Sequence, residues 1–138
     1  MSTGPTGLTR DAGWEIGVSK TLPLPADTVW DFIASPEGVA LWLGGVKGGL
    51  PTEKGAAYET VDGVTGEVRG YRPGDRVRLT HGGTTVQVAV SAAGPGKAVL
   101  HFHQERLASA EEREQRRTHW QGVMRRVVEA LVPDAPRA

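Results

Sequence analysis

The sequence predicts an α+β fold in which an antiparallel sheet of six strands carries two short helices after its first strand and a long helix at its end. Three observations support this prediction. Residues 24–43 hold two short amphipathic patterns in tandem, and residues 58–104 alternate in short runs separated by turn dipeptides. Residues 109–132 then place apolar side chains at helical spacing, which completes the order of elements.

The first strand is predicted over residues 14–22. Trp14, Ile16, Val18 and Leu22 recur there at period two, so they lie on one face of an extended chain. Their alternation with polar residues is typical of a strand that is buried on one side only.

The first helix follows at Pro25. A proline at a helix start costs no hydrogen bond, and the Asp27 carboxylate faces the positive end of the helix dipole. Val29, Phe32 and Ile33 then fall on one face, which predicts that they are the buried side of this helix.

A second helix is predicted to begin directly after the first. Ser35 is a suitable N-cap, and Pro36 occupies the first helical position. Its buried stripe is predicted to be Val39, Trp42 and Leu43.

Residues 44–51 are too rich in glycine for a helix or a central strand, so we expect a mobile loop. These residues also lack the spacing of a phosphate-binding loop.

The middle of the chain is predicted to be a five-stranded meander. Asp62-Gly63 is a hairpin signal, and the other runs are separated by pairs of glycine or by proline followed by glycine. The predicted strands cover residues 58–61, 64–71, 76–81, 84–92 and 98–104.

The last element is predicted to be an amphipathic helix over residues 109–132, packed through its second half only. Gly122 interrupts this half, and because glycine costs about 1 kcal/mol in a helix, the sequence suggests that a strand or a ligand approaches the backbone there. The apolar stripe consists of Trp120, Val123, Met124, Val127, Val128 and Leu131.

Composition limits the classes of protein to consider. Sixteen basic residues balance sixteen acidic residues, and the arginines of residues 113–126 alternate with glutamates, so we expect a salt-bridged helix face and no nucleic-acid partner. There is no cysteine, and no apolar run is long enough to span a membrane. We expect a cytoplasmic monomer or homodimer without membrane contact, with residues 1–12 disordered, 13–132 forming the domain and 133–138 a tail.

The order of elements, together with several short motifs, resembles the START-like superfamily, also called the SRPBCC or Bet v 1-like superfamily. Residues 25–31, Pro-Ala-Asp-Thr-Val-Trp-Asp, are similar to the start motif of the branch named after the C-terminal domain of the activator of Hsp90 ATPase. Residues 35–37 with Trp42, and the pair His119-Trp120 with Leu131, continue the resemblance along residues 13–132. It implies a helix-grip fold, in which a curved six-stranded antiparallel sheet grips the long helix.

The resemblance also implies a cavity between sheet and helix that takes a hydrophobic or aromatic small molecule. On this basis we expect a ligand-binding protein with no catalytic residue, no cofactor and no metal. The alternatives are an enzyme of the cyclase, aromatase or hydratase kind acting in the same cavity, or a stress- or chaperone-associated interaction module. The residues expected to line the cavity are Trp30, Trp42, Tyr58, Val77, Leu79, Val88, Leu100, Phe102, Trp120, Val123, Met124 and Val127.

The histidines decide between these alternatives. His101 and His103 lie two apart on a strand and point to one face, whereas Leu100 and Phe102 point to the other. If the apolar pair faces the core, both histidines face solvent. The alternative turns them into the cavity with His81 and His119, where they would form an acid–base or metal-binding set.

Overall fold

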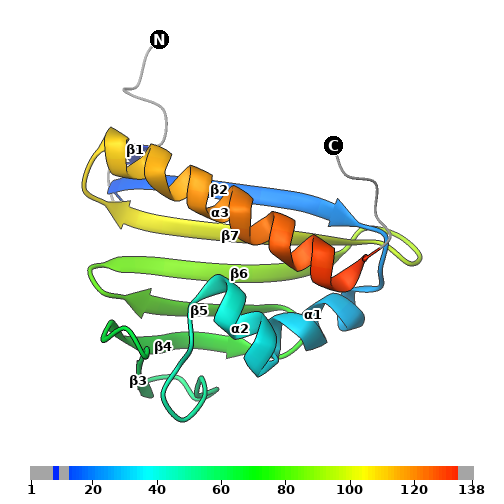
Figure 1. Cartoon of the computed structure of the whole chain (residues 1–138), viewed down its shortest axis with the longest axis horizontal. Helices are drawn as coiled ribbons and strands as arrows, with labels where there is room; N and C mark the ends of the chain where they lie inside the picture. The colour runs from blue at the N-terminus through cyan, green and yellow to red at the C-terminus, as the bar shows by residue number, and fades with distance from the viewer. Residues whose placement is uncertain (1–7, 10–12, 134–138) are drawn as a thin grey trace.

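A seven-stranded antiparallel sheet carries all three helices on one face, as the computed structural model shows for residues 8–9 and 13–133 (Figure 1). The spatial order of the strands is β1-β2-β7-β6-β5-β4-β3, so that the first long strand pairs with the last. The strands are β1 (Leu8–Thr9), β2 (Gly13–Leu22), β3 (Ala57–Glu59), β4 (Thr65–Arg72), β5 (Arg76–His81), β6 (Thr84–Ala92) and β7 (Ala98–Leu107).

The six predicted strands are all present, and β1 is an addition. Leu8 pairs with Trp14 and Thr9 with Gly13, so a two-residue strand forms inside the segment that we expected to be disordered. Two residues cannot establish a periodicity, which is why the sequence does not predict this strand. The rest of that segment, 1–7 and 10–12, and residues 134–138 of the predicted tail lie outside the described residues.

The helix pair consists of α1 (Ala26–Ala34) and α2 (Pro36–Trp42). The predicted cap is confirmed, because the backbone N–H of Gly38 donates to Ser35 Oγ at 3.1 Å. The predicted buried face of α1 needs one correction: Trp30 is buried and Phe32 only partly so. The side chains at 29, 30 and 33 face the sheet because α1 lies across β6 and β7, and the tertiary contact selects the face.

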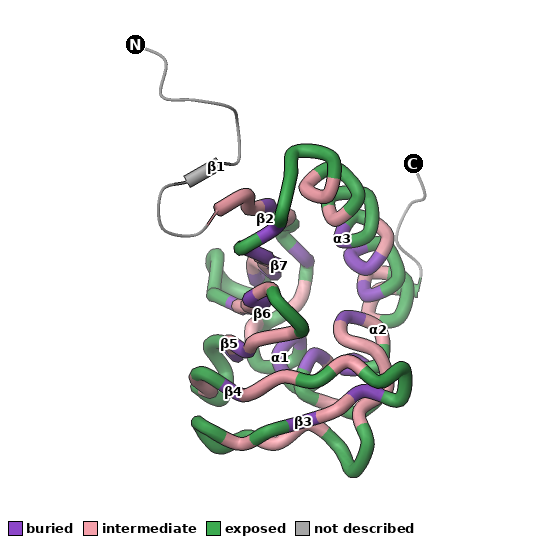
Figure 2. The backbone as a smooth tube through the Cα atoms, turned by 90° about the vertical axis from the view of Figure 1, so that its left-hand side faces the viewer, coloured by how far each residue is buried: buried purple, intermediate pink, exposed green. Residues whose placement is uncertain are grey.

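The long helix α3 (Ala110–Leu131) crosses the same face of the sheet and packs mainly on β2. Its N-cap is Ser109, whose Oγ accepts from the Glu112 N–H at 3.1 Å. Figure 2 shows buried positions on the sides of helix and sheet that face one another. The Trp120 indole stacks on Phe102 with ring centroids 4.9 Å apart, at the centre of the core.

The approach of a strand to Gly122, one of the two alternatives that the sequence suggested, is wrong. A Cβ built on Gly122 would meet only the ends of two arginine side chains, Arg125 at 3.8 Å and Arg126 at 4.0 Å. The glycine therefore lies on the side of α3 away from the sheet. No contact among the described residues offsets the lower helix propensity of glycine at this position.

Two β-bulges shift the alternation of the sheet. The register between β2 and β7 changes between Trp14 and Ile16, and Arg106 on β7 has a φ of 66°, which is rare for a residue other than glycine. The register between β4 and β5 changes between Val68 and Gly70. Each bulge turns the side chains beyond it to the opposite face from the one that strict alternation predicts.

The predicted glycine-rich loop connects α2 to β3 and lies against the end of the helix pair (Figure 1). Val46 forms an isolated bridge with Thr60, and the Lys47 ammonium pairs with the Glu59 carboxylate at 3.1 Å. Leu50 is partly buried against the core, so this connection covers part of the apolar interior.

Candidate functional site

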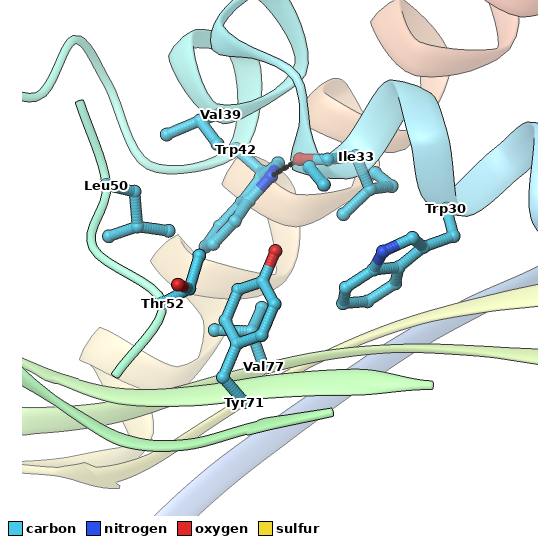
Figure 3. A pocket seen from close by; sticks show the side chains of 9 residues that line it. Trp30, Ile33, Val39, Trp42, Leu50, Thr52, Tyr71 and Val77 are labelled. Atoms are coloured by element: carbon cyan, nitrogen blue, oxygen red, sulfur yellow. Dashed lines mark hydrogen bonds between the residues drawn. The ribbon is translucent and has the colours of Figure 1, made fainter. Parts of the chain in front are cut away.

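An aromatic pocket lies between α1, α2, the connection after α2, and strands β4 and β5 (Figure 3). Trp30 comes from α1, Trp42 from α2 and Tyr71 from β4, and the three rings surround a cavity of ≈ 30 Å³, space for about one water molecule. Trp30 and Tyr71 meet edge to face with centroids 5.7 Å apart. The remaining lining residues are Ile33, Ala34, Val39, Leu50, Thr52 and Val77.

Three polar groups of this pocket have no hydrogen-bond partner within the part of the chain that the structure describes. They are the Trp30 indole N–H, the Tyr71 hydroxyl and the Thr52 hydroxyl. The Trp42 indole N–H is different, because it donates to the Ile33 carbonyl oxygen at 3.0 Å and fixes α2 on α1. Figure 3 shows the Tyr71 hydroxyl directed from the sheet toward the two helices. Burial raises the pKa of Tyr71, so this hydroxyl remains protonated and can donate.

A separate cluster of polar residues, Tyr58, Thr80 and His81, lies on the same face of the sheet, where β5 ends beneath α3. The Tyr58 hydroxyl is 2.6 Å from the Thr80 carbonyl oxygen and 2.9 Å from His81 Nδ1. A carbonyl oxygen cannot donate, so the single phenolic proton lies toward Thr80. His81 must then donate from Nδ1 to Tyr58, which leaves Nε2 of the neutral ring as a free acceptor.

Burial and a positive charge on α3 keep His81 neutral. Burial first, and then the positive charge of Arg116, lowers the pKa of His81 below its usual value. The pKa of His119 on α3 is lowered by burial and by Arg116, Arg126 and His81. None of these causes is a carboxylate, so both imidazoles are neutral near pH 7.

A buried hydrogen-bond chain connects α3 to the same end of the sheet. The Trp120 indole N–H donates to Gln104 Oε1 at 2.9 Å, and Gln104 Nε2 donates to Thr84 Oγ1 at 3.0 Å. The Thr84 hydroxyl donates in turn to the His81 carbonyl oxygen at 2.7 Å. Gln104 is the one buried side-chain amide among the described residues, and these bonds satisfy it and hold the backbone of His81 in place.

The twelve residues predicted to line a cavity are all buried in one hydrophobic cluster. Trp30, Trp42 and Val77 line the aromatic pocket, and Tyr58 supports His81. The other eight belong to the same buried cluster, four from the strands and four from α3: Leu79, Val88, Leu100, Phe102, Trp120, Val123, Met124 and Val127.

His101 and His103 lie on the outer face of the sheet, away from α3. Leu100 and Phe102 are fully buried, so the alternation turns both histidines outward, as one of the two interpretations of the sequence predicts. The other two histidines lie on the helix side of the sheet: His119 is part of α3, and His81 is close enough to it to affect its pKa.

Sequence reasoning did not assign Tyr71, Leu50 and Thr52 to the site. Strict alternation along β4 places Tyr71 on the face opposite Val68, and only the bulge between them brings the tyrosine to the helices. Leu50 and Thr52 lie in a connection whose path no periodicity describes. One signal could have indicated Tyr71: it is a tyrosine near the end of a strand that is otherwise poor in large apolar residues.

No helix in the described part of the chain is long and apolar enough to cross a membrane. Val61 is the one large hydrophobic residue that is exposed among the described residues, at 64%. A single exposed valine gives no support to an apolar docking surface.

No family model matches the sequence, and no curated protein matches it. Several solved structures share the fold. CalU16 from Micromonospora echinospora matches in its crystal structure with a TM-score of 0.72 and 17% identity, over 91% of this chain and 82% of that one. DynU16, described as a protein in the dynemicin biosynthetic locus, matches with a TM-score of 0.69 and 23% identity over 85% of this chain. Our chain spans about half of DynU16, 46% of its length.

Protein MLL2253 from Mesorhizobium loti matches over almost its whole length, with a TM-score of 0.69, 13% identity, and coverage of 89% of this chain and 99% of that chain. At these identities the comparisons show the fold alone. The chain has the helix-grip fold that the sequence predicted, with a long C-terminal helix on a curved antiparallel sheet.

Proposed function

We propose that this protein binds a small aromatic molecule that carries a hydrogen-bond acceptor, in the pocket formed by Trp30, Trp42 and Tyr71. The observation that carries the proposal is the combination of three aromatic rings with three polar groups that have no protein partner. No buried side-chain polar atom of the described residues lacks a partner, so water can reach these three groups in the free protein. A ligand oxygen that accepts from Trp30 and Tyr71 replaces this water, and its ring packs against the indoles.

The ligand must enlarge the pocket. A free volume of ≈ 30 Å³ holds water, whereas pockets for drug-sized ligands measure about 300 Å³ or more. The connection after α2 is the part best able to move, because Leu50 and Thr52 cover the pocket from it. Its backbone turns at glycines with positive φ, and a Cβ on Gly44 or Gly48 would meet nothing within 4 Å.

The solved structures support this proposal at the level of the fold. DynU16, whose fold matches this chain, is described as a protein in the dynemicin biosynthetic locus. Membership of the START-like superfamily, and of its Hsp90-activator branch, stays a prediction from the sequence motifs.

The test compares 2-naphthol with naphthalene, two probes of similar shape that differ in one hydroxyl. The four tryptophan indole N–H signals in a ¹H–¹⁵N NMR spectrum report on the site, with Trp14 and Trp120 as internal references. We expect 2-naphthol to shift the signals of Trp30 and Trp42 selectively. Native mass spectrometry of protein purified from its own host then identifies any ligand that co-purifies.

A matched pair of tyrosine variants tests the hydrogen bond. Tyr71→Phe keeps the ring and removes the hydroxyl, so we expect it to weaken 2-naphthol binding by about 2- to 10-fold, the value of one hydrogen bond, with naphthalene unaffected. Tyr58→Phe removes a hydroxyl outside the pocket and serves as the control. Equal shifts of all four indole signals, or no shift at the solubility limit of either probe, would contradict the proposal.

A second candidate function is acid–base catalysis beneath α3, and the tautomer of His81 favours it. A neutral imidazole with a free Nε2 acceptor, held by Tyr58, can remove a proton from a bound hydroxyl. The test is the ¹⁵N chemical shift of His81 Nε2 during the same titration. A shift that follows 2-naphthol binding supports contact with the ligand, and an unchanged Nε2 signal in the saturated complex argues against this function.

A further inference from the structure

One wall of the aromatic pocket is formed by the connection between α2 and β3. Residues 45–54 of this connection form a covering loop, because Leu50 and Thr52 line the pocket from it. Leu50 is partly buried and Thr52 is exposed. Figure 3 shows these two side chains on the opposite side of the pocket from Trp30. The covering loop therefore separates part of the pocket from solvent.

The other walls of the pocket belong to the core of the protein. Trp42 and Ile33 are almost fully buried, and the hydrogen bond between them, 3.0 Å long, joins α2 to α1. Tyr71 and Val77 are directly paired in the ladder between β4 and β5. Neither of these walls can move without a loss of close packing or of strand pairing.

Few interactions hold the covering loop by comparison. Within the described chain, residues 45–52 make two backbone hydrogen bonds with residues outside the loop. The Lys47 N–H donates to the Glu59 carbonyl oxygen at 2.9 Å, and the Val61 N–H donates to the Gly45 carbonyl oxygen at 2.8 Å. The Lys47 ammonium also pairs with the Glu59 carboxylate at 3.1 Å, and both side chains are about half exposed. Interactions of this kind are individually weak, because water competes for them.

A glycine is anchored at each end of the covering loop. Gly44 follows α2, and its N–H donates to the Val39 carbonyl oxygen at 3.2 Å. Gly55 precedes β3, and its N–H donates to the Val68 carbonyl oxygen at 2.7 Å. Their φ angles are 97° and 90°, and glycine moves between such angles and negative ones at little steric cost. A weakly held segment between two anchored glycines has the arrangement of a hinged loop.

The pocket needs such a movement before a ligand can enter. The closed loop leaves a volume of ≈ 30 Å³, so a naphthalene ring fits only after the loop has moved. Opening withdraws two partly buried apolar side chains, Val46 and Leu50, from the core. The two hydrogen bonds that break lie beside β3, the last strand of the sheet, where water replaces them.

We propose that the covering loop is a hinged lid, which pivots at Gly44 and Gly55, is held closed by the contacts of Lys47 with Glu59, and controls the entry of ligands to the aromatic pocket. This inference rests on the proposed function and adds the step that limits the rate of binding. Lid opening precedes ligand entry, and the strength of the contact with Glu59 sets how often the lid opens.

A reversible cross-link between the lid and its neighbour tests this inference. A Cβ at Gly45 would lie 3.4 and 3.5 Å from the two Cγ atoms of Val61, so the double variant Gly45→Cys, Val61→Cys brings two thiols within reach of a disulfide. The wild-type chain has no cysteine that could compete. We expect oxidation to slow 2-naphthol binding, measured by stopped-flow tryptophan fluorescence, at least about 10-fold, and dithiothreitol to reverse the effect. The oxidised single variant Val61→Cys is the control and should bind at an unchanged rate.

A charge-matched pair of lysine variants tests the contact that holds the lid closed. Lys47→Gln removes the ion pair with Glu59, and we expect the association rate of 2-naphthol to rise about 1.5- to 5-fold, the value of one exposed ion pair. Lys54→Gln removes the same charge from the same loop. This lysine has no ion pair with any described residue, so the rate should not change. 2-Naphthol is uncharged near pH 7, so electrostatic steering does not separate the two variants.

Hydrogen exchange in the ligand-free protein distinguishes failure of the lid from failure of the proposed function. One opening breaks both hydrogen bonds of the loop, so we expect the Lys47 and Val61 amides to share one protection factor. It should be at least about 10-fold lower than the protection of the anchored Gly55 and Val68 amides.

The outcomes separate as follows. Wild-type protein that fails to bind 2-naphthol contradicts the proposed function, and hydrogen exchange then decides on the lid. If the disulfide does not form, the lysine variants and hydrogen exchange decide. Equal protection of the four amides, or an undiminished binding rate in a monomer whose disulfide is confirmed by its mass, would overturn the lid.

Discussion

Replacing Gly122 with alanine should stabilise the protein. Gly122 lies in the middle of α3, and an added Cβ would make only ordinary contacts, 3.8 Å from Arg125 Nη2 and 4.0 Å from Arg126 Nη1. Alanine is favoured over glycine inside a helix by about 1 kcal/mol, partly because it restricts the unfolded chain. We therefore expect the free energy of unfolding to rise by about 0.5–1 kcal/mol in a urea titration, with an unchanged slope.

The same change should appear in the melting temperature. Unfolding entropy is about 2.1 cal/mol/K per residue, so for 138 residues a gain of about 1 kcal/mol raises Tm by roughly 3 °C. Scanning calorimetry measures this shift directly.

Gly38→Ala is the control, because its Cβ would overlap the Phe32 carbonyl oxygen where α1 meets α2. A backbone clash cannot be relieved by a side-chain rotation, so we expect a loss of at least about 2 kcal/mol. A Gly122→Ala variant less stable than the wild type would refute the reasoning, since it would mean that a backbone or ligand does pack against position 122.

Three further predictions concern caps and histidines. Ser35→Ala removes the acceptor for the Gly38 N–H and should lower the unfolding free energy by about 1 kcal/mol in urea, whereas an unchanged midpoint would mean that water replaces the cap. The folded-state pKa values of His81 and His119 lie below the usual value, so the unfolded chain takes up protons first as the pH falls, and stability should decrease below about pH 6.5. His81→Gln should make this decrease smaller, and a stability that rises between pH 7 and 5.5 would contradict the assigned directions. Long-range ¹H–¹⁵N NMR should find neutral His81 protonated on Nδ1, and Tyr58→Phe should shift the ring toward the Nε2–H form; an Nε2–H form in the wild type would be inconsistent with the Tyr58 hydrogen bond.

The local elements of this fold follow from short-range chemistry. β5 and β6 have the predicted bounds because proline–glycine and glycine–glycine turns separate two alternating runs. Ser35 caps α2 because its hydroxyl reaches an N–H only three residues away. These interactions lie within a few residues of sequence, so the pattern of side chains is sufficient to predict them.

The face that a side chain occupies was predictable only where alternation is unbroken. Leu100 and Phe102 point inward and His101 outward, as the period of β7 requires. Tyr71 was not assigned because it lies beyond a bulge, and a bulge depends on which strand becomes the neighbour. Phe32 is less buried than expected for a related reason, since the sheet beneath α1 selects its buried face.

The sequence by itself determined the order of all the elements except β1, the Ser35 cap, the turns and most of the apolar residues that form the core. Each of these depends on neighbours close in the chain or on a regular period. Only the tertiary structure decided that Trp30, Trp42 and Tyr71 surround one pocket and that Glu15 meets His103 across the sheet. Residues 15 and 103 come together because the first long strand pairs with the last, and the contact between them is fixed by strand pairing and a bulge rather than by any local preference.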